Sequence, residues 1–167
     1  EPQQGGPDTP VSPADPAPTG KPSKDEMLDR LKGQKACTQM GCIDGFTVDV
    51  EPQVWPHGQY KLTIAADDRN TICEGALPLP ACGKPALTCK GDVEVMVGES
   101  GCALPPAQHG FGGFTFKGAP AKVSIAITRG GKEVAKAAYT PAYKKVQPNG
   151  PECGPTCNHA SDKLTVK

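Results

Sequence analysis

Hydrophobic and polar residues alternate along much of the chain after Ile43. A period of two puts successive side chains on opposite faces of a strand, so it predicts strands with one buried face and one exposed face. The clear alternating runs lie at residues 46–50, 60–64, 93–97 and 123–127. Weaker runs lie at residues 71–75, 114–116 and 164–166. No convincing helical period appears after Gly33.

Turn residues separate these runs. Pro56-His57-Gly58 precedes the second run, and Arg129-Gly130-Gly131-Lys132 joins the fourth run to residues 133–139. A glycine pair favours the tight turn of a β-hairpin, because that turn needs positive φ angles. Six to eight short strands separated by turns predict a mostly β fold, namely an antiparallel β-sandwich of the immunoglobulin-like or transthyretin-like kind.

The beginning of the chain follows no such pattern. Residues 1–22 hold seven prolines and a single large aliphatic residue, Val11. Such a segment cannot bury enough apolar surface to offset the entropy that it would lose on ordering. We therefore expect a disordered Pro/Gly-rich tether, partly in the polyproline II conformation.

A short helix is predicted at residues 23–33. Ser23 and Glu26 have the spacing of a capping box, and Gly33 is a typical helix stop. The apolar residues on one face of this helix are Met27, Leu28 and Leu31. We assign the rest of the chain, residues 34–167, to a single cysteine-rich β domain.

The composition changes the picture of what stabilises this domain. Leu, Ile, Val and Phe make up only 28 of 167 residues, or 17%, which is little for a domain held together by apolar burial alone. An even number of cysteines predicts a disulfide framework instead, and disulfides persist in oxidising compartments. We therefore expect an extracytoplasmic protein that is outer membrane-associated, periplasmic or secreted. The eight cysteines are Cys37, Cys42, Cys73, Cys82, Cys89, Cys102, Cys153 and Cys157.

Spacing cannot choose among the 105 pairings that eight cysteines allow. Cysteines that are close in sequence suggest small loops, and a bridge that closes about 15 residues contributes on the order of 3 kcal/mol in the chain-entropy model. We infer that the bridges, more than the core, keep the chain folded. The pairs suggested in this way are Cys37/Cys42, Cys82/Cys89 and Cys153/Cys157. Cys73/Cys102 would then bracket the proline-rich stretch from Ala76 to Leu87.

The charge excludes two classes of partner. The chain has 18 basic and 18 acidic residues and no cluster of lysine and arginine. Nucleic acids and anionic membranes need a concentrated positive field, so we expect neither as a partner. No apolar run approaches the roughly 20 residues of a membrane-spanning helix. A membrane contact is expected only through an N-terminal lipid anchor lost before Glu1, after removal of a signal peptide.

Motifs with a built-in catalytic mechanism do not occur in the sequence: there is no GxSxG elbow, no HExxH helix and no phosphate loop. His57 and His109 are expected to be surface loop residues, and Asp67-Asp68 resembles a turn more than a catalytic pair. We predict no enzyme, no catalytic residue and no cofactor.

A metal site is a weak alternative near the C-terminus. Cys153, Cys157 and His159 bring ligands of the kind that zinc prefers close together in sequence. They form one isolated half-site without a CxxC motif, so a loop stapled by disulfides is the better explanation. We predict no metal.

Two features indicate binding. Aromatic side chains stack on sugars and grip peptides, and Trp55 and Tyr143 are the candidates here, although most aromatic residues are expected in the core. A stapled, proline-rich loop presents an ordered apolar surface at little entropic cost. Pro78, Leu79 and Pro80 are therefore candidate ligand contacts, and a simple covering for one sheet explains the loop equally well.

Several segments also carry a resemblance to a known group. They are Pro56–Tyr60, Cys73–Pro80, Gly101–Pro106 and Thr140–Cys153. On these segments the chain resembles uncharacterised, cysteine-rich lipoproteins of myxobacteria and related soil bacteria. The resemblance implies an envelope-anchored protein with a leader that ends at a lipidated cysteine, followed by a polar spacer. It implies no activity and no catalytic residues.

These features together predict a non-enzymatic extracytoplasmic module for binding or structure, a tethered lipoprotein domain with a protein or glycan partner in the cell envelope. One alternative is a carbohydrate-binding domain that uses exposed aromatic residues. Another is a protease inhibitor that presents the stapled proline-rich loop.

Overall fold

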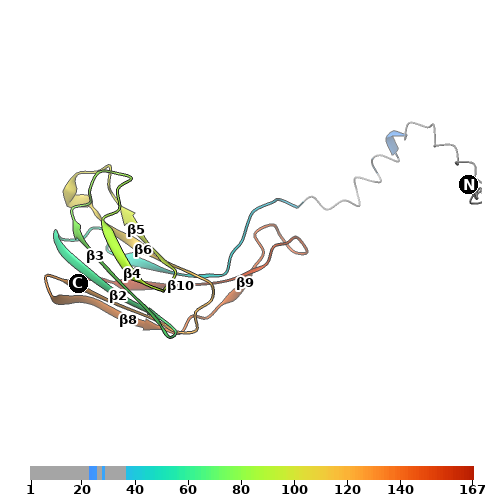
Figure 1. Ribbon diagram of the computed structural model, residues 1–167. Helices are drawn as coiled ribbons and strands as arrows, with labels where there is room; N and C mark the ends of the chain where they lie inside the picture. Colours follow the sequence, from blue (N-terminus) through green and yellow to red (C-terminus); the bar gives the residue numbers. More distant parts are fainter. Residues whose placement is uncertain (1–22, 26–27, 29–36) are drawn as a thin grey trace, which may run out of the picture. The chain divides into compact units, whose positions relative to one another are not determined.

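The computed structural model describes residues 23–25, 28 and 37–167 (Figure 1). The chain divides into two units, residues 1–36 and 37–167, close to the boundary expected for the β domain. The tether predicted at residues 1–22 and most of the helix predicted at 23–33 lie outside the described residues. The described part of that helix, other than Ser23, is helical. Within the same described part of the chain, no helix is long and apolar enough to cross a membrane.

The second unit is a sandwich of two five-stranded sheets, so the predicted mostly β fold is confirmed. The first sheet has the order β5-β6-β1-β10-β9 and the second has the order β4-β3-β2-β7-β8. Neighbouring strands are antiparallel, except that β1 and β10 run parallel. The strands of the first sheet are β1 (Gly45–Glu51), β5 (Val95–Ser100), β6 (Gly110–Lys117), β9 (Lys144–Val146) and β10 (Cys157–Thr165). Those of the second sheet are β2 (Gly58–Ala66), β3 (Arg69–Leu77), β4 (Leu87–Gly91), β7 (Val123–Arg129) and β8 (Lys132–Tyr139).

Every run of alternating residues corresponds to a strand, and Gly130-Gly131 forms the predicted turn between β7 and β8. The predictions missed β4 and β9. Most residues of β4 and all of β9 are exposed, so neither strand needs the apolar alternation that identifies a half-buried strand.

The core is larger than the composition suggests. It is a single cluster of 22 buried residues contributed by both sheets. Phe46, Phe114 and Phe116 are fully buried in it, together with Leu62 and Ile64 of β2. Only three of the 28 large apolar residues precede Cys37, so nearly all of them belong to the sandwich.

All eight cysteines form disulfides, as predicted, but the suggested pairing is wrong. Cys73 and Cys89 are register partners on β3 and β4, a relation that was hidden because β4 was not predicted. Residues five apart in an extended segment are too far from each other to be bridged, since the chain advances about 3.3 Å per residue. The observed pairs are Cys37–Cys153, Cys42–Cys157, Cys73–Cys89 and Cys82–Cys102.

Two of these bridges fix the start of the domain to its end. We call residues 37–44 the arm; it runs beside residues 147–157. The side-chain amide of Asn149 joins the two segments, because its Oδ1 accepts hydrogen bonds from Thr38 Oγ1 (2.7 Å) and the Met40 N–H (2.8 Å). Its Nδ2 donates to the carbonyl oxygens of Met40 (2.9 Å) and Gly154 (2.8 Å).

The two arm bridges are expected to act non-additively. They close loops with sequence separations of 116 and 115 residues, but once either bridge is formed the other closes a ring of only about ten residues. In the chain-entropy model, loss of one bridge then costs about 3 kcal/mol and loss of both costs about 7 kcal/mol. Cys37→Ala/Cys153→Ala, Cys42→Ala/Cys157→Ala and the quadruple variant, compared by urea unfolding, test this. If the quadruple variant loses only the sum of the stabilities lost by the two double variants, the expected non-additivity is contradicted.

Candidate functional site

Three loops gather at the end of the sandwich opposite to the arm. β5 runs parallel to β1, because both are antiparallel to β6, so these two strands end at the same end of the sandwich. The loop after β1 leads to the start of β2, and β3 ends where β2 begins. The loops that follow β1, β3 and β5 therefore meet at one end, on the left of Figure 1, whereas the arm is on the right. We call residues 52–57, 78–86 and 101–109 the loop cluster.

His109 joins all three loops. Its side chain is only 5% exposed, which corrects the prediction of a surface residue. Nδ1 accepts a hydrogen bond from the Leu79 N–H (2.9 Å), Nε2 donates to the Leu104 carbonyl oxygen (2.8 Å), and the His109 carbonyl accepts from the Trp55 N–H (3.1 Å). A neutral imidazole with its proton on Nε2 satisfies both ring contacts.

Further bonds tie the loops in pairs. The Cys82–Cys102 bridge joins the second loop to the third, and the Ala86 N–H donates to the Glu99 carboxylate at 2.7 Å. His57 Nε2 donates to the carbonyl oxygen of Pro106 (3.1 Å), which joins the first loop to the third. The loop cluster is therefore held by a covalent bond and by hydrogen bonds from several directions.

An aromatic group lies beneath the cluster. Trp55, Tyr60 and Phe111 are buried, with ring centroids 4.9 to 5.9 Å apart in edge-to-face contacts. Trp55 Nε1 donates to the Pro52 carbonyl oxygen (3.0 Å) and the Tyr60 hydroxyl donates to the Pro56 carbonyl oxygen (2.6 Å). Burial raises the pKa of Tyr60, although Arg129 opposes the effect. These rings support the loop backbone from inside.

The predicted stacking platform is therefore wrong. Trp55 is 1% exposed and unavailable to a glycan. Tyr143 is half-buried, and its hydroxyl donates to the Pro120 carbonyl oxygen (2.8 Å) at the arm end of the sandwich. Burial, helped by Asp67 and Asp44, raises the pKa of Tyr143. The structure thus places the two predicted aromatic residues at opposite ends of the domain.

The outer surface of the loop cluster carries exposed apolar side chains and little formal charge. Val54 is 47% exposed and Leu104 is 53% exposed. Of the predicted loop contacts, Pro78 and Pro80 are exposed, whereas Leu79 is buried and belongs to the core. Lys84 is the sole Lys, Arg, Asp or Glu in the three loops. The sequence analysis did not identify Val54 or Leu104. Leu104 follows Cys102 closely and precedes two prolines, which is the same kind of pattern that made residues 78–80 candidates.

The alternative metal site is not formed. Cys153 and Cys157 are bound in disulfides, so neither offers a thiolate to a metal. His159 Nε2 lies 3.3 Å from Thr47 Oγ1 on the outer face of the first sheet. Within residues 37–167 and the few described residues before them, no group of three potential metal ligands occurs.

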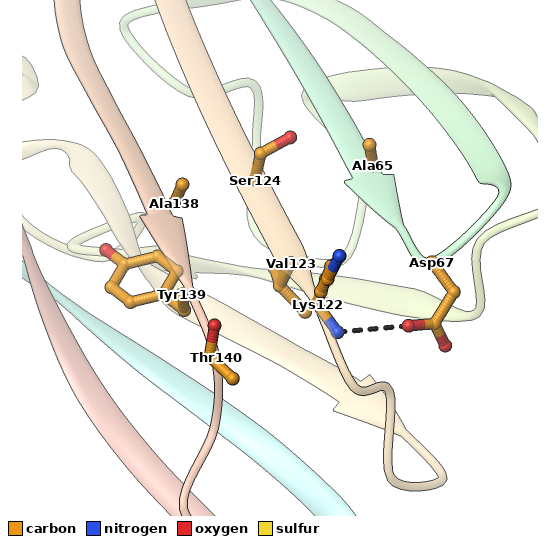
Figure 2. A pocket seen from close by; sticks show the side chains of 8 residues that line it. All are labelled: Ala65, Asp67, Lys122, Val123, Ser124, Ala138, Tyr139 and Thr140. Carbon is orange, nitrogen blue, oxygen red and sulfur yellow. Dashed lines mark hydrogen bonds between the residues drawn. The ribbon is translucent and has the colours of Figure 1, made fainter.

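A shallow hollow of about 320 Å³ lies at the arm end of the second sheet (Figure 2). Asp67 lines it, and its carboxylate accepts hydrogen bonds from the backbone N–H groups of Ala121 (2.9 Å) and Lys122 (3.0 Å). Asp67 and Asp68 form the turn between β2 and β3, as predicted. The carboxylate therefore fixes the neighbouring loop, and we assign it a structural role.

His109→Ala is expected to loosen the loop cluster. The substitution leaves the Leu79 N–H and the Leu104 carbonyl without their partners in a buried site, which costs about 1–3 kcal/mol for such groups. His57→Ala is the matched control, because His57 is exposed and makes one surface bond. Amide hydrogen exchange should show faster exchange at Leu79 in His109→Ala alone. Unchanged exchange at Leu79 would contradict the role given to His109.

Tyr139 also lines the hollow in Figure 2. We expect its ionisation at alkaline pH to lower the stability of the folded state. Burial, followed by the negative charge of Asp162, raises the pKa of Tyr139 from 10.0 to about 12. The folded state thus holds this proton more tightly than the unfolded state, so its contribution to stability is complete below pH 10 and disappears as the pH rises from 10 to 12.

Ultraviolet titration of tyrosinate, with unfolding curves across the same pH range, checks this. Tyr139→Phe should remove the transition of highest pKa and weaken the loss of stability above pH 10. A native protein whose tyrosines all ionise at pH 10 would contradict the expectation.

The comparisons with known proteins assign no family. No family model, no curated protein and no solved structure matches the chain. The resemblance to cysteine-rich lipoproteins therefore stays a hypothesis, and the function has to be inferred from the geometry of the domain.

Proposed function

We propose that residues 37–167 form a protein-binding module of an oxidising compartment, and that the loop cluster is its binding surface. The observation that carries the proposal is the cross-linked state of this cluster. His109, the Cys82–Cys102 bridge and the buried Trp55 together fix the loops that carry the exposed apolar side chains of Val54 and Leu104.

A rigid apolar surface is suited to binding for energetic reasons. Association loses affinity when loops become ordered, so loops that are ordered in advance avoid this cost. Val54 and Leu104 add apolar area that is exposed in the free domain, and burial of such area yields roughly 25 cal/mol per Å². With almost no charge in the cluster, a protein surface fits better than a nucleic acid or an anionic lipid.

The remaining parts of the domain support this role. Four disulfides indicate an oxidising compartment. The chain enters the domain at Cys37, at the end opposite to the loop cluster, so a protein attached through its N-terminal segment can present the loops away from the attachment point. We extend the proposal to the cell envelope, with the N-terminal segment as a lipoprotein tether.

The geometry favours neither alternative. A glycan site lacks its platform because Trp55 is buried. A substrate-like inhibitor presents an extended segment to the protease, whereas residues 81–84 form a turn closed by a hydrogen bond from the Lys84 N–H to the Ala81 carbonyl oxygen (3.1 Å).

Photo-crosslinking in the producing cells tests the proposed surface. A photoreactive residue in place of Leu104 should give a discrete protein adduct, whereas the same residue in place of Ile43, which is 73% exposed at the arm end, should not. Val54→Asp should lower the yield of the Leu104 adduct about tenfold, equivalent to about 1.4 kcal/mol. Val146→Asp, a similarly exposed valine outside the loops, is the matched control. Equal adducts at both positions, or none at Leu104, would refute the proposal.

A further inference from the structure

Strand β5 is an edge strand whose regular part, before the bulge at Gly98/Glu99, has few of the usual protections. Exposed sheet edges pair with other strands, and proteins prevent this with charged side chains, proline, β-bulges, short strands or a covering segment. β4 is short and carries Lys90, β9 has only three residues, two of them lysines, and β8 carries two lysines and accepts a hydrogen bond from the C-terminal Lys167. β5 contains neither lysine nor proline, its single charged residue, Glu99, lies beyond the bulge, and its Met96 is 63% exposed on the outer face of the sheet.

On the side away from β6, backbone groups of β5 lack a hydrogen-bond partner within the described part of the chain. The Lys117 N–H donates to the Glu94 carbonyl oxygen at 3.0 Å, so in the register of β5 and β6 the next hydrogen-bonded pair is Met96–Thr115. Val95 and Val97 then direct their backbone groups away from β6. The Val95 N–H donates to the Val93 carbonyl oxygen (3.0 Å). Among the described residues, none bonds the Val95 carbonyl or either backbone group of Val97, so these three groups are available.

The part of the β5 edge that can pair regularly with another strand is centred on Met96. The register between β5 and β6 shifts between Gly98 and Glu99, and such a bulge ends regular pairing. The regular window therefore extends from Glu94 to Gly98 with Met96 at its centre. An antiparallel copy placed on this window puts Met96 opposite Met96, Val97 opposite Val95 and Glu94 opposite Gly98, with no like charges face to face.

We propose that a second copy of this chain pairs with β5 about a two-fold axis at Met96, which makes a continuous ten-stranded sheet. In each direction the Val97 N–H donates to the Val95 carbonyl of the other copy. The N-terminal residues 1–22 do not suit this edge, because no more than four consecutive residues there lack proline and proline has no N–H for the ladder.

This dimer is independent of the proposed function. The loop cluster lies outside the paired window, so it stays accessible in both copies. Because the two β5 strands are antiparallel, the two loop clusters face opposite ends of the dimer. Five paired residues form an interface below the usual size of a stable complex, so the dimer is expected to dissociate with a constant on the order of 0.1 mM.

Disulfide trapping tests the register directly. All native cysteines are paired, so Met96→Cys adds the sole thiol. In the proposed register, directly opposite residues have Cβ atoms roughly 4.5–5.5 Å apart, and mild oxidation should give a covalent dimer. Thr115→Cys is the matched control: Thr115 is the β6 partner of Met96, and its two copies would lie about 14 Å apart across three strand spacings.

Sedimentation of the unmodified protein gives a second readout. The mass should rise toward that of a dimer with concentration, and Met96→Lys, which places two positive charges opposite each other, should keep the protein monomeric. Val146→Lys is the control and should dimerise normally. A wild-type monomer up to millimolar concentration, or equal trapping of Met96→Cys and Thr115→Cys, would overturn the proposal. Loss of the Leu104 adduct with dimerisation intact would instead refute the proposed function alone.

Discussion

The pairing of the first strand with the last one is the constraint on which the rest of this domain depends. β1 lies between β6 and β10 in the first sheet, so the sheet is complete only when the two ends of the domain are together. This pairing joins residues more than 100 positions apart, and loop closure over that length costs entropy before any contact forms. The Cys42–Cys157 and Cys37–Cys153 bridges and the amide of Asn149 reinforce the junction where β1 and β10 begin.

This junction also makes the two ends of the domain different. β1 and β10 run parallel away from it, so the Cys37–Cys153 and Cys42–Cys157 bridges occupy the arm end. The loops after β1, β3 and β5 occupy the far end. Loops usually supply the variable and functional surface of a sandwich, and here they have lost much of their freedom. The imidazole of His109 bonds both the Leu79 N–H and the Leu104 carbonyl, so loops at the surface of the sandwich are fixed by a buried side chain.

Local patterns predicted the strands well because the signal that identifies them is local. Phe46, Val48 and Val50 alternate because one face of β1 is buried, and this is readable without any knowledge of its partners. The disulfide pairs depend on which strands become neighbours, and Cys73–Cys89 requires β4, which has no alternation to reveal it. His109 could not be recognised for a similar reason: its two ring partners come from a loop 30 residues away and from its own loop.

The exposed apolar residues are informative because of where they occur. Single apolar residues on a surface need no explanation, and by that standard neither Val54 nor Met96 would attract attention alone. Their positions, however, are special. Val54 lies in the loop cluster, which a disulfide and several hydrogen bonds hold together. Met96 lies at the centre of the β5 edge, which lacks the lysines found on the edge strands β4, β8 and β9. The chain has only 28 Leu, Ile, Val and Phe residues, and an apolar side chain that stays at the surface, such as Val54 or Met96, adds nothing to its small core. The two proposed associations, through the loop cluster and through β5, would give these side chains a role.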